Sequence, residues 1–118
     1  MRYMLLIYGD ESRFATITEA EQQALMQKWM AYDSEIRAAG VTSQGDALQS
    51  VGTATSVRSN GGEPLVTDGP FAETKEQLGG YYMLDVPDLD EAIKWAQKCP
   101  GAEHGTIELR PVMEFDQG

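Results

Sequence analysis

The sequence predicts a single α+β domain with the element order strand, helix, strand, strand, helix, strand, and a β-hairpin inserted between the second and third strands. Two observations carry this prediction. Two segments with helical spacing of apolar residues each begin at a capping residue, and short apolar or alternating runs bounded by turn residues lie around them. A chain of 118 residues can bury one hydrophobic core but not two, and no linker divides it, so residues 1–118 are expected to form one domain.

The first strand and the first helix have the clearest signals. Residues 2–8 are almost wholly apolar and are followed by glycine and aspartate, which predicts a buried central strand covered on both faces. Thr18, with a glutamate three positions later, forms a capping box, and apolar residues then recur at helical spacing as far as a C-capping Gly40. Met26 and Met30 widen the apolar surface of this helix, which favours contact with a second partner as well as with its own sheet.

The middle of the chain predicts a strand and then a hairpin. Residues 41–50 are expected to form a strand that Gly45 interrupts. Residues 53–58 alternate β-branched with small or polar side chains, which is typical of a strand. A Ser-Asn-Gly-Gly turn leads to a short return strand over residues 63–67, and the resulting hairpin delivers the chain to the loop that follows.

This loop has the most restricted backbone in the sequence. Gly69 reaches conformations closed to other residues, and Pro70 fixes its own φ and restrains the residue before it. The Asp68 side chain is suited to accept hydrogen bonds from backbone N–H groups just beyond it, and Phe71 supplies an apolar anchor. We therefore expect a rigid loop of mixed chemical character, of the kind that forms part of a site.

The last third of the chain completes the α+β order. Residues 81–86 are expected to form a strand with aromatic character, and residues 88–98 a helix that begins at a capping aspartate and ends before Pro100. Residues 106–113 are expected to form the last strand. With the hairpin of residues 53–67 set aside as an insertion, this is the order of the ferredoxin-like fold, βαββαβ.

Such a fold leaves one face of its sheet bare, because both helices cover the same side. The strands carry too many apolar side chains to be divided between the helices and water: Tyr3, Tyr8, Tyr81, Tyr82, Ile107 and Leu109. Pairing two sheets across a homodimer would bury the second face and enclose a cavity. We therefore expect a homodimer. The alternative is a monomer in which the hairpin and its loop cover the sheet.

The composition excludes several classes of partner. Nine Lys and Arg against nineteen Asp and Glu give a net charge of −10, which repels nucleic acid and anionic membrane surfaces, so neither is expected as a partner. No apolar run approaches the roughly 20 residues that cross a bilayer. Acidic residues follow the first apolar run at once, so we expect no signal peptide. Cys99 is alone and cannot form an internal disulfide, which fits a cytoplasmic protein.

Five segments distributed over the whole chain resemble DGPF-domain proteins of the YCII-related family: residues 1–8, 68–76, 79–82, 85–92 and 105–111. The resemblance implies a dimeric α+β barrel of ferredoxin-like subunits, in the broad company of small monooxygenases, isomerases and chlorite dismutase-like proteins. Some relatives carry a His on the first helix and a partner Asp, proposed as an acid and base pair. Residues 18–39 contain no His, so that pair is not carried over. The resemblance also implies a regulatory link to extracytoplasmic-function sigma factors, beside which such proteins are often encoded.

Asp68 and His104 are the candidates for acid and base chemistry. Asp68 is either a general base or substrate-orienting carboxylate at the rim of a pocket, or only a cap or turn acceptor. His104 is the sole imidazole and follows the second helix, where it is either functional or an exposed loop residue. Because both residues lie near strand ends, we hypothesise that they meet as an acid and base pair.

Four further residues are candidates for substrate binding: Phe71, Lys75, Tyr81 and Arg110. The two cations either receive an anionic substrate group or pair with surface carboxylates, and the aromatic residues either line a pocket or pack in the core. The acidic residues around the second helix lack the spacing of a calcium loop. There is no phosphate-binding loop, nucleophile elbow or pair of cysteines, so neither a metal nor a cofactor is predicted.

Two functional hypotheses follow. In the first, the protein is a small cytoplasmic enzyme or ligand-binding protein that acts on an organic molecule in the cavity of the homodimer. In the second, it is a non-catalytic regulator whose acidic surface engages a basic protein, such as a sigma factor. A deep pocket with convergent polar groups favours the first hypothesis, whereas a filled interior and an exposed apolar patch favour the second.

Overall fold

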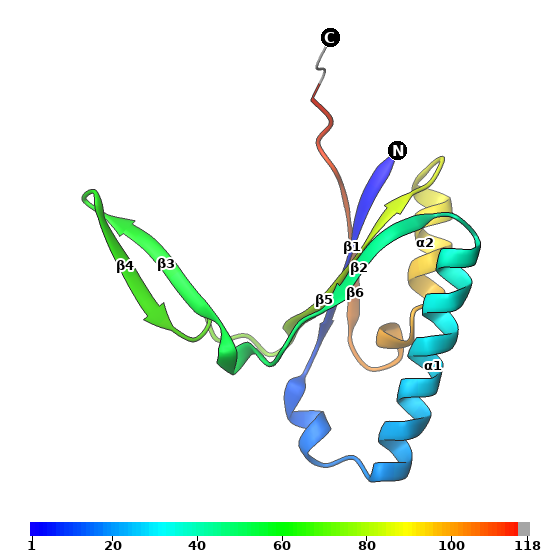
Figure 1. The fold of residues 1–118 in the computed structure, drawn as a ribbon, viewed down its shortest axis with the longest axis horizontal. Helices are drawn as coiled ribbons and strands as arrows, with labels where there is room; N and C mark the ends of the chain where they lie inside the picture. The colour runs from blue at the N-terminus through cyan, green and yellow to red at the C-terminus, as the bar shows by residue number, and fades with distance from the viewer. Residues whose placement is uncertain (116–118) are drawn as a thin grey trace.

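A computed structural model describes residues 1–115, and in this part of the chain two helices and six strands form the ferredoxin-like arrangement with an inserted hairpin (Figure 1). The elements are β1 (Arg2–Gly9), η1 (Glu11–Ala15), α1 (Glu19–Ala38), β2 (Thr42–Ala47), η2 (Val51–Thr53), β3 (Thr55–Asn60), β4 (Glu63–Asp68), β5 (Gln77–Asp85), α2 (Leu89–Lys98), η3 (Pro100–Glu103) and β6 (Thr106–Pro111), where η marks a 3₁₀ turn. The main sheet is antiparallel with the order β2-β5-β1-β6, and β3 pairs only with β4. The predicted fold class is confirmed.

Capping side chains set the start of both helices, as predicted. The Thr18 Oγ1 atom accepts a hydrogen bond from the backbone N–H of Glu21 at 3.1 Å, which satisfies one of the free donors of the first turn of α1. The Asp88 Oδ1 atom does the same for the N–H of Glu91 in α2 at 3.0 Å. At the end of α1 the chain leaves the helix through Gly40, which has a φ of 74° that a side chain would disfavour.

The core lies between the helices and one face of the main sheet. Leu5 of β1, Leu84 of β5, Ile36 of α1 and Ala92 of α2 are completely buried there. Aromatic rings widen this core, because Tyr32 of α1 contacts Tyr82, Trp29 and Trp95 edge to face. Burying one large aliphatic side chain contributes about 1.5–3 kcal/mol, so this layer supplies most of the stability of the domain.

Some boundaries differ from those expected. Strand β5 begins at Gln77 rather than at residue 81, because β1 pairs with it along nearly its whole length. Residues 51–53 form a short 3₁₀ turn, so that β3 starts at Thr55. Gly45 lies inside β2 without ending it. A Cβ atom at this position would lie 2.5 Å from a ring carbon of Tyr82, so the glycine makes room for the aromatic side chain of the neighbouring strand.

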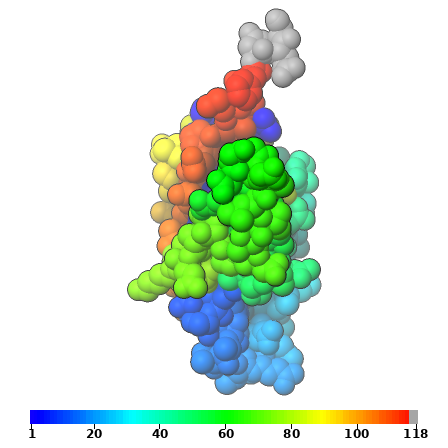
Figure 2. Space-filling model, turned by 90° about the vertical axis from the view of Figure 1, so that its left-hand side faces the viewer, coloured from blue at the N-terminus to red at the C-terminus, as the bar shows by residue number. Residues whose placement is uncertain are grey.

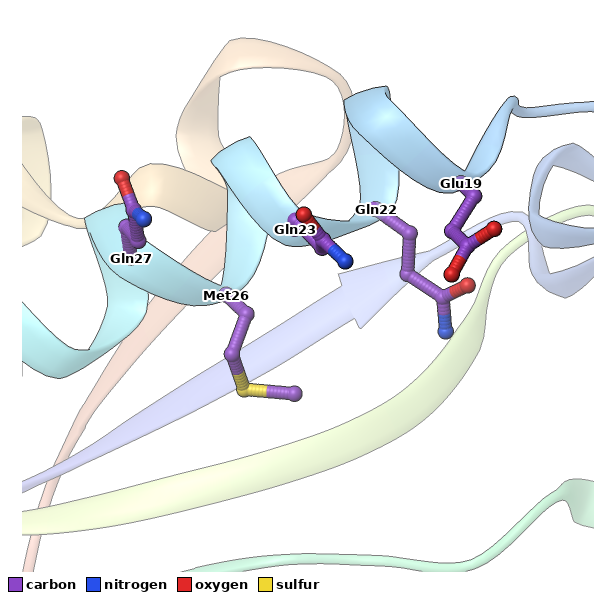
Figure 3. A pocket seen from close by; sticks show the side chains of 5 residues that line it. All are labelled: Glu19, Gln22, Gln23, Met26 and Gln27. Carbon is purple, nitrogen blue, oxygen red and sulfur yellow. The ribbon is translucent and has the colours of Figure 1, made fainter.

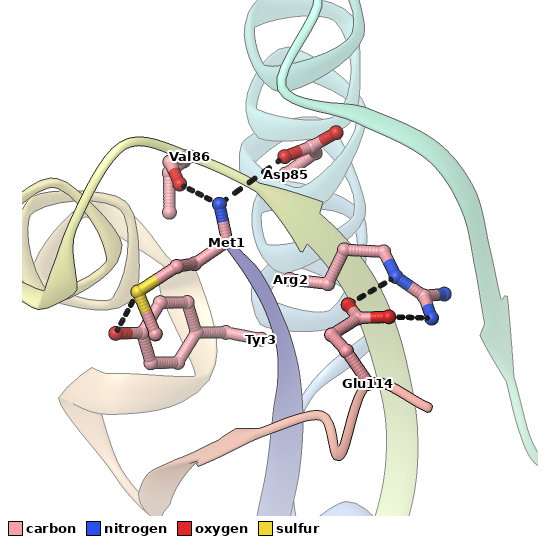
Figure 4. Close-up of polar contacts among 6 residues, drawn as sticks. All are labelled: Met1, Arg2, Tyr3, Asp85, Val86 and Glu114. Atoms are coloured by element: carbon pink, nitrogen blue, oxygen red, sulfur yellow. Dashed lines mark hydrogen bonds and ion pairs between the residues drawn. The ribbon is translucent and has the colours of Figure 1, made fainter. Parts of the chain in front are cut away.

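The N-terminal end of β1 is tied to both neighbouring strands (Figure 4). The amino group of Met1 donates a hydrogen bond to the carbonyl oxygen of Val86 at 2.8 Å. The Arg2 guanidinium binds both carboxylate oxygens of Glu114, at 2.8 and 2.9 Å. These contacts hold the segment after β5 and the segment after β6 against β1.

Neither helix among residues 1–115 has the length and apolar character that a membrane span requires.

Only one face of the main sheet is covered by helices, so the expectation that β1 is covered on both faces is wrong for one chain. Four of the six apolar strand residues named above lie on the helix side: Tyr3, Tyr82, Ile107 and Leu109. Tyr8 and Tyr81 lie on the other side. The hairpin does not cover this other face. It leaves the sheet on the side away from the helices, and its strands pair only with each other (Figure 1), so the hairpin does not supply the cover that the monomer alternative requires. The oligomeric state stays a prediction.

Candidate functional site

The helix-free face of the main sheet combines an apolar centre with polar margins. Residues directly opposite each other in paired strands share a face, so the strand register assigns its members. One row across the sheet runs from Asp46 through Tyr81 and Leu6 to Glu108, and the next runs from Gln44 through Met83 and Met4 to Arg110. The apolar residues are on the two central strands and the polar ones are on the edge strands β2 and β6, apart from the hydroxyl of Tyr81.

A hydrogen-bonded cluster occupies the β2 margin of this face. The Tyr81 Oη atom donates to Asp46 Oδ2 at 2.7 Å and accepts from Gln44 Nε2 at 3.1 Å. The hydrogen bond to the carboxylate raises the pKa of Tyr81, so the phenol keeps its proton at neutral pH. Tyr81 therefore serves as an oriented polar group with a fixed proton, rather than as a base.

Arg110 stands on the opposite margin, on β6. Its backbone neighbour across the strand pair is Met4, so the guanidinium borders the apolar centre of the face. Within residues 1–115 no carboxylate forms an ion pair with Arg110, although the chain has an excess of acidic residues. A free guanidinium beside an apolar surface is suited to a carboxylate or phosphate on an organic ligand.

Asp68 lies at the base of the hairpin, at the end of β4 and opposite Thr55. The backbone after it is fixed as the sequence suggested. Gly69 has a φ of 95°, its N–H donates to the carbonyl oxygen of Ala54 at 2.6 Å, and its own carbonyl accepts from the Ser56 hydroxyl at 2.8 Å. The Asp68 carboxylate itself makes no hydrogen bond within the described residues, so its role as a turn acceptor is not seen.

The other loop candidates lie at the surface. Phe71 is 78% exposed, so within one chain it is not the apolar anchor that the sequence suggested. Lys75 lies near Asp10, whose pKa is lowered chiefly by a hydrogen bond from the Ser12 side chain and to a smaller extent by this lysine. Lys75 forms no ion pair among residues 1–115.

His104 directly follows η3, a segment that contacts α1, α2, β1 and β6. It is exposed, and its Nε2 atom lies 4.0 Å from the carboxylate of Glu103, which also binds Lys28 of α1. No hydrogen bond or ion pair joins His104 to Asp68 within the described chain. A pairing of the two between different copies of the chain stays a prediction.

In the region of α1 where some relatives carry a histidine, this chain has the buried Tyr32 and the partly exposed Asp33. The Asp33 carboxylate accepts a hydrogen bond from Tyr82 Oη at 2.7 Å and pairs with Arg37 at 3.0 Å. The hydrogen bond from Tyr82 is the main cause that lowers the pKa of Asp33. Tyr32 donates to the carbonyl oxygen of Trp95 at 2.8 Å. With these partners satisfied, the cluster is explained by packing between α1, β5 and α2.

Depressions elsewhere on the surface lack the convergent groups of a binding site. One of about 400 Å³ lies along the first turns of α1, and its lining comes from that helix alone (Figure 3): Glu19, Gln22, Gln23, Met26 and Gln27. Another lies between α1 and the segment around η3, where its charged residues pair with each other, Lys28 with Glu103 and Glu35 with Lys98. Both are open to solvent. As the described residues form them, neither of these two depressions encloses a ligand.

Of the residues predicted from the sequence, the structure places Tyr81 and Arg110 on one face, Asp68 at the base of the hairpin, and Phe71 and Lys75 in the segment between β4 and β5. Sequence reasoning missed Gln44 and Asp46. The signal was present, because polar residues alternate along β2, but their relevance depends on which strand lies beside them. Pairing with β5 puts both next to Tyr81.

Comparison with known proteins agrees with this fold and adds no activity. The model of the YCII-related domain matches residues 1–116. An uncharacterized protein from Rhizobium meliloti (strain 1021) is 36% identical over 120 aligned positions, which cover 100% of this chain and 97% of the relative. A match over nearly the whole length, together with this degree of identity, establishes the relationship, and the chain belongs to the YCII-related family.

Proposed function

We propose that the protein is a homodimer that binds a small organic acid between its two helix-free sheet faces. The observation that carries this proposal is the uncovered face itself, where Met4, Leu6 and Met83 lie between the Tyr81 cluster and Arg110, which has no ion-pair partner among residues 1–115. Pairing two such faces would remove these apolar side chains from water and enclose the polar groups, as small-molecule sites require.

The chemistry of the margins supports the ligand class. Arg110 supplies a charge that is always present and a fork that matches a carboxylate, and Tyr81 supplies a hydroxyl held by Asp46 and Gln44. An aromatic or aliphatic body would lie on the methionine and leucine side chains. A ligand with an acidic end and an apolar body satisfies both margins at once. Whether the bound molecule is also transformed depends on groups that the partner or a ligand brings to this face.

Binding of model acids to the purified protein tests the proposal. Benzoate, phenylacetate and hexanoate are titrated while the melting temperature is followed, since a ligand that binds only the folded state raises it. We expect Arg110→Gln to weaken binding by about tenfold or more, which corresponds to about 1.4 kcal/mol and is typical of losing one charged hydrogen-bond partner. Arg58→Gln is the matched control, because Arg58 lies on the exposed hairpin. Equal binding by the two variants would contradict the proposal.

Exposed apolar groups favour a second candidate, a regulator that engages a basic protein such as an extracytoplasmic-function sigma factor. Phe71 is 78% exposed, and the net charge of −10 would attract a basic partner. A monomer that binds a purified sigma factor, with an affinity that falls steeply as salt is added, would support this candidate. A stable homodimer that takes up the acids and shows no such binding would support the first.

A further inference from the structure

The β3–β4 hairpin, residues 55–68, projects from the molecule as an arm. Figure 1 shows the arm diverging from the main sheet on the side opposite the helices, and Figure 2 shows it standing in front of the sheet when the molecule is viewed from that side. Its two strands pair only with each other, and eleven of their twelve residues are exposed, with Ser56 half-buried. The arm therefore presents both of its faces outside the domain.

One face of the arm is apolar and almost free of charge. Val57 lies opposite Val66, and Ser59 lies opposite Pro64, so these four side chains share a face that carries no charge until Asp68 at its base. The two valines are 64% and 61% exposed. The other face carries charged and polar side chains with one leucine: Ser56, Arg58, Asn60, Glu63, Leu65 and Thr67.

A hairpin of this kind, with no other layer packed on it, is expected to have low stability in water. A two-stranded hairpin alone is marginally stable at best, and it becomes stable when its apolar face packs against another layer. Within the described chain, no other element packs on the apolar face of the arm. Contiguous exposed apolar side chains bordered by polar ones mark interaction sites, and Val57 and Val66 lie directly opposite each other on this face. The pattern therefore indicates that the apolar face is covered in the working protein.

The exposed area and the radius of gyration of one chain are larger than a compact monomer requires, which supports a large interface with a partner. One chain exposes 8491 Å², whereas a compact monomer of this mass exposes about 6,300 Å². The radius of gyration is 16.6 Å, compared with about 13.5 Å expected for a compact domain of this length. The excess of roughly 2,200 Å² exceeds the roughly 800 Å² that each partner contributes to a standard protein interface.

The base of the arm fixes its direction before any partner arrives. The Glu11 carboxylate accepts hydrogen bonds from the Val51 N–H at 2.9 Å and from the Ser50 hydroxyl at 3.0 Å, which ties η1 to the segment that enters the arm. On the returning side, the Gly69 N–H donates to the Ala54 carbonyl oxygen. Because its base is held on both sides, the arm loses little conformational freedom when it binds.

We propose that the apolar face of each arm packs against a second copy of this chain. Each of the two arms would then contact the partner on the side of the molecule opposite the helices. This inference rests on the homodimer proposed above. A second copy fits better than a basic protein, because the apolar face carries a single acidic residue, Asp68 at its base, and offers little charge that would attract one. The arm and the helix-free face are both uncovered and lie on the same side of the molecule (Figure 1), so a two-fold axis can cover both surfaces at once.

Neighbouring residues on opposite faces of β4 provide a matched test. Val66 lies on the apolar face and Leu65 on the polar face, with exposures of 61% and 51%. The dimer dissociation constant of the full chain is measured by sedimentation equilibrium, where the wild type should have twice the 13.0 kDa mass of one chain. We expect Val66→Lys to raise this constant about 100-fold or more, because a lysine charge would be buried without a partner. Leu65→Lys should change it less than about threefold, as is usual for an exposed position.

A third variant separates this inference from the proposed function. Leu6→Lys places a charge on the helix-free face and should also dissociate the dimer if the sheet faces pack together. If Leu6→Lys dissociates the dimer and Val66→Lys does not, the proposed arm contact is overturned and the proposed sheet interface stands. Equal effects of Val66→Lys and Leu65→Lys would overturn the arm contact as well. A wild type that remains monomeric at all concentrations would overturn both proposals.

Discussion

Replacing Gly105 by alanine should destabilise the protein through a clash with the backbone of β1. A Cβ atom at this position would overlap the carbonyl oxygen of Tyr8 and lie 3.2 Å from that of Gly101. Both neighbours are backbone atoms, and the Gly105 N–H already binds the Gly101 carbonyl at 2.9 Å, so no flexible side chain can move aside. The start of β6 must therefore shift away from β1.

The magnitude follows from the cost of overpacking. Forcing extra atoms into a packed site costs about 1–3 kcal/mol and sometimes more, and a backbone clash belongs at the upper end. Alanine recovers about 0.4–1 kcal/mol by restricting the unfolded chain, so the net loss should be about 2–3 kcal/mol. Since unfolding a chain of this length releases about 0.25 kcal/mol per kelvin of entropy, the melting temperature should fall by about 10 °C.

Thermal unfolding followed by circular dichroism measures this change, with Gly9→Ala as the control. Gly9 ends β1, and a Cβ atom built there has no atom within 4 Å beyond its chain neighbours. The control should be neutral or more stable by up to about 1 kcal/mol. If Gly105→Ala melts within about 2 °C of Gly9→Ala, a difference worth only about 0.5 kcal/mol, then the close approach of β6 to Tyr8 does not constrain the fold and the reasoning is refuted.

Three further predictions concern the core. Tyr82→Phe removes the hydrogen bond to Asp33 and should cost about 1–2 kcal/mol in urea unfolding at neutral pH. Because that bond lowers the pKa of Asp33, its contribution is present above the unfolded pKa of about 3.9 and is lost as the pH falls through the lower folded value. If Tyr82→Phe lowered the free energy of unfolding equally in strong acid, this pH dependence would be contradicted. Ile36→Ala should cost about 2–5 kcal/mol in the same assay, since the side chain is completely buried, and a cost below about 1 kcal/mol would contradict the assigned core. Burial raises the pKa of the Cys99 thiol to about 11, so a disulfide reagent should label the native protein far more slowly than the unfolded one, and equal rates would show that the thiol is accessible.

Local patterns in the sequence determined the elements of this protein and their order. Capping residues and helical spacing located α1 and α2, and the turn residues located the hairpin, because these signals act within a few residues of the structure that they specify. The order of the elements then led to the ferredoxin-like fold. The likeness to the YCII-related family, visible in segments along the whole chain, is confirmed.

The faces of the sheet depended on tertiary structure. Tyr81 and Tyr82 are adjacent aromatic residues in one strand, yet Tyr82 packs on Tyr32 in the core and Tyr81 binds Asp46 on the helix-free face. Periodicity shows that neighbours alternate, but the side that receives the helices is set by the handed path of the whole chain. The same path brings Gln44 and Asp46 to Tyr81, a grouping that the separate sequence patterns did not predict.

The direction of the hairpin also depended on tertiary structure. The existence of a hairpin and of a constrained glycine loop after it could be predicted from local sequence, since both are local properties of the backbone. Only the packed chain decided that the hairpin leaves the sheet and stands away from it, because the hydrogen bonds of Glu11 at its base come from a segment about 40 residues earlier. Contacts between distant segments place surfaces in space, and those contacts decided which surfaces this chain leaves uncovered.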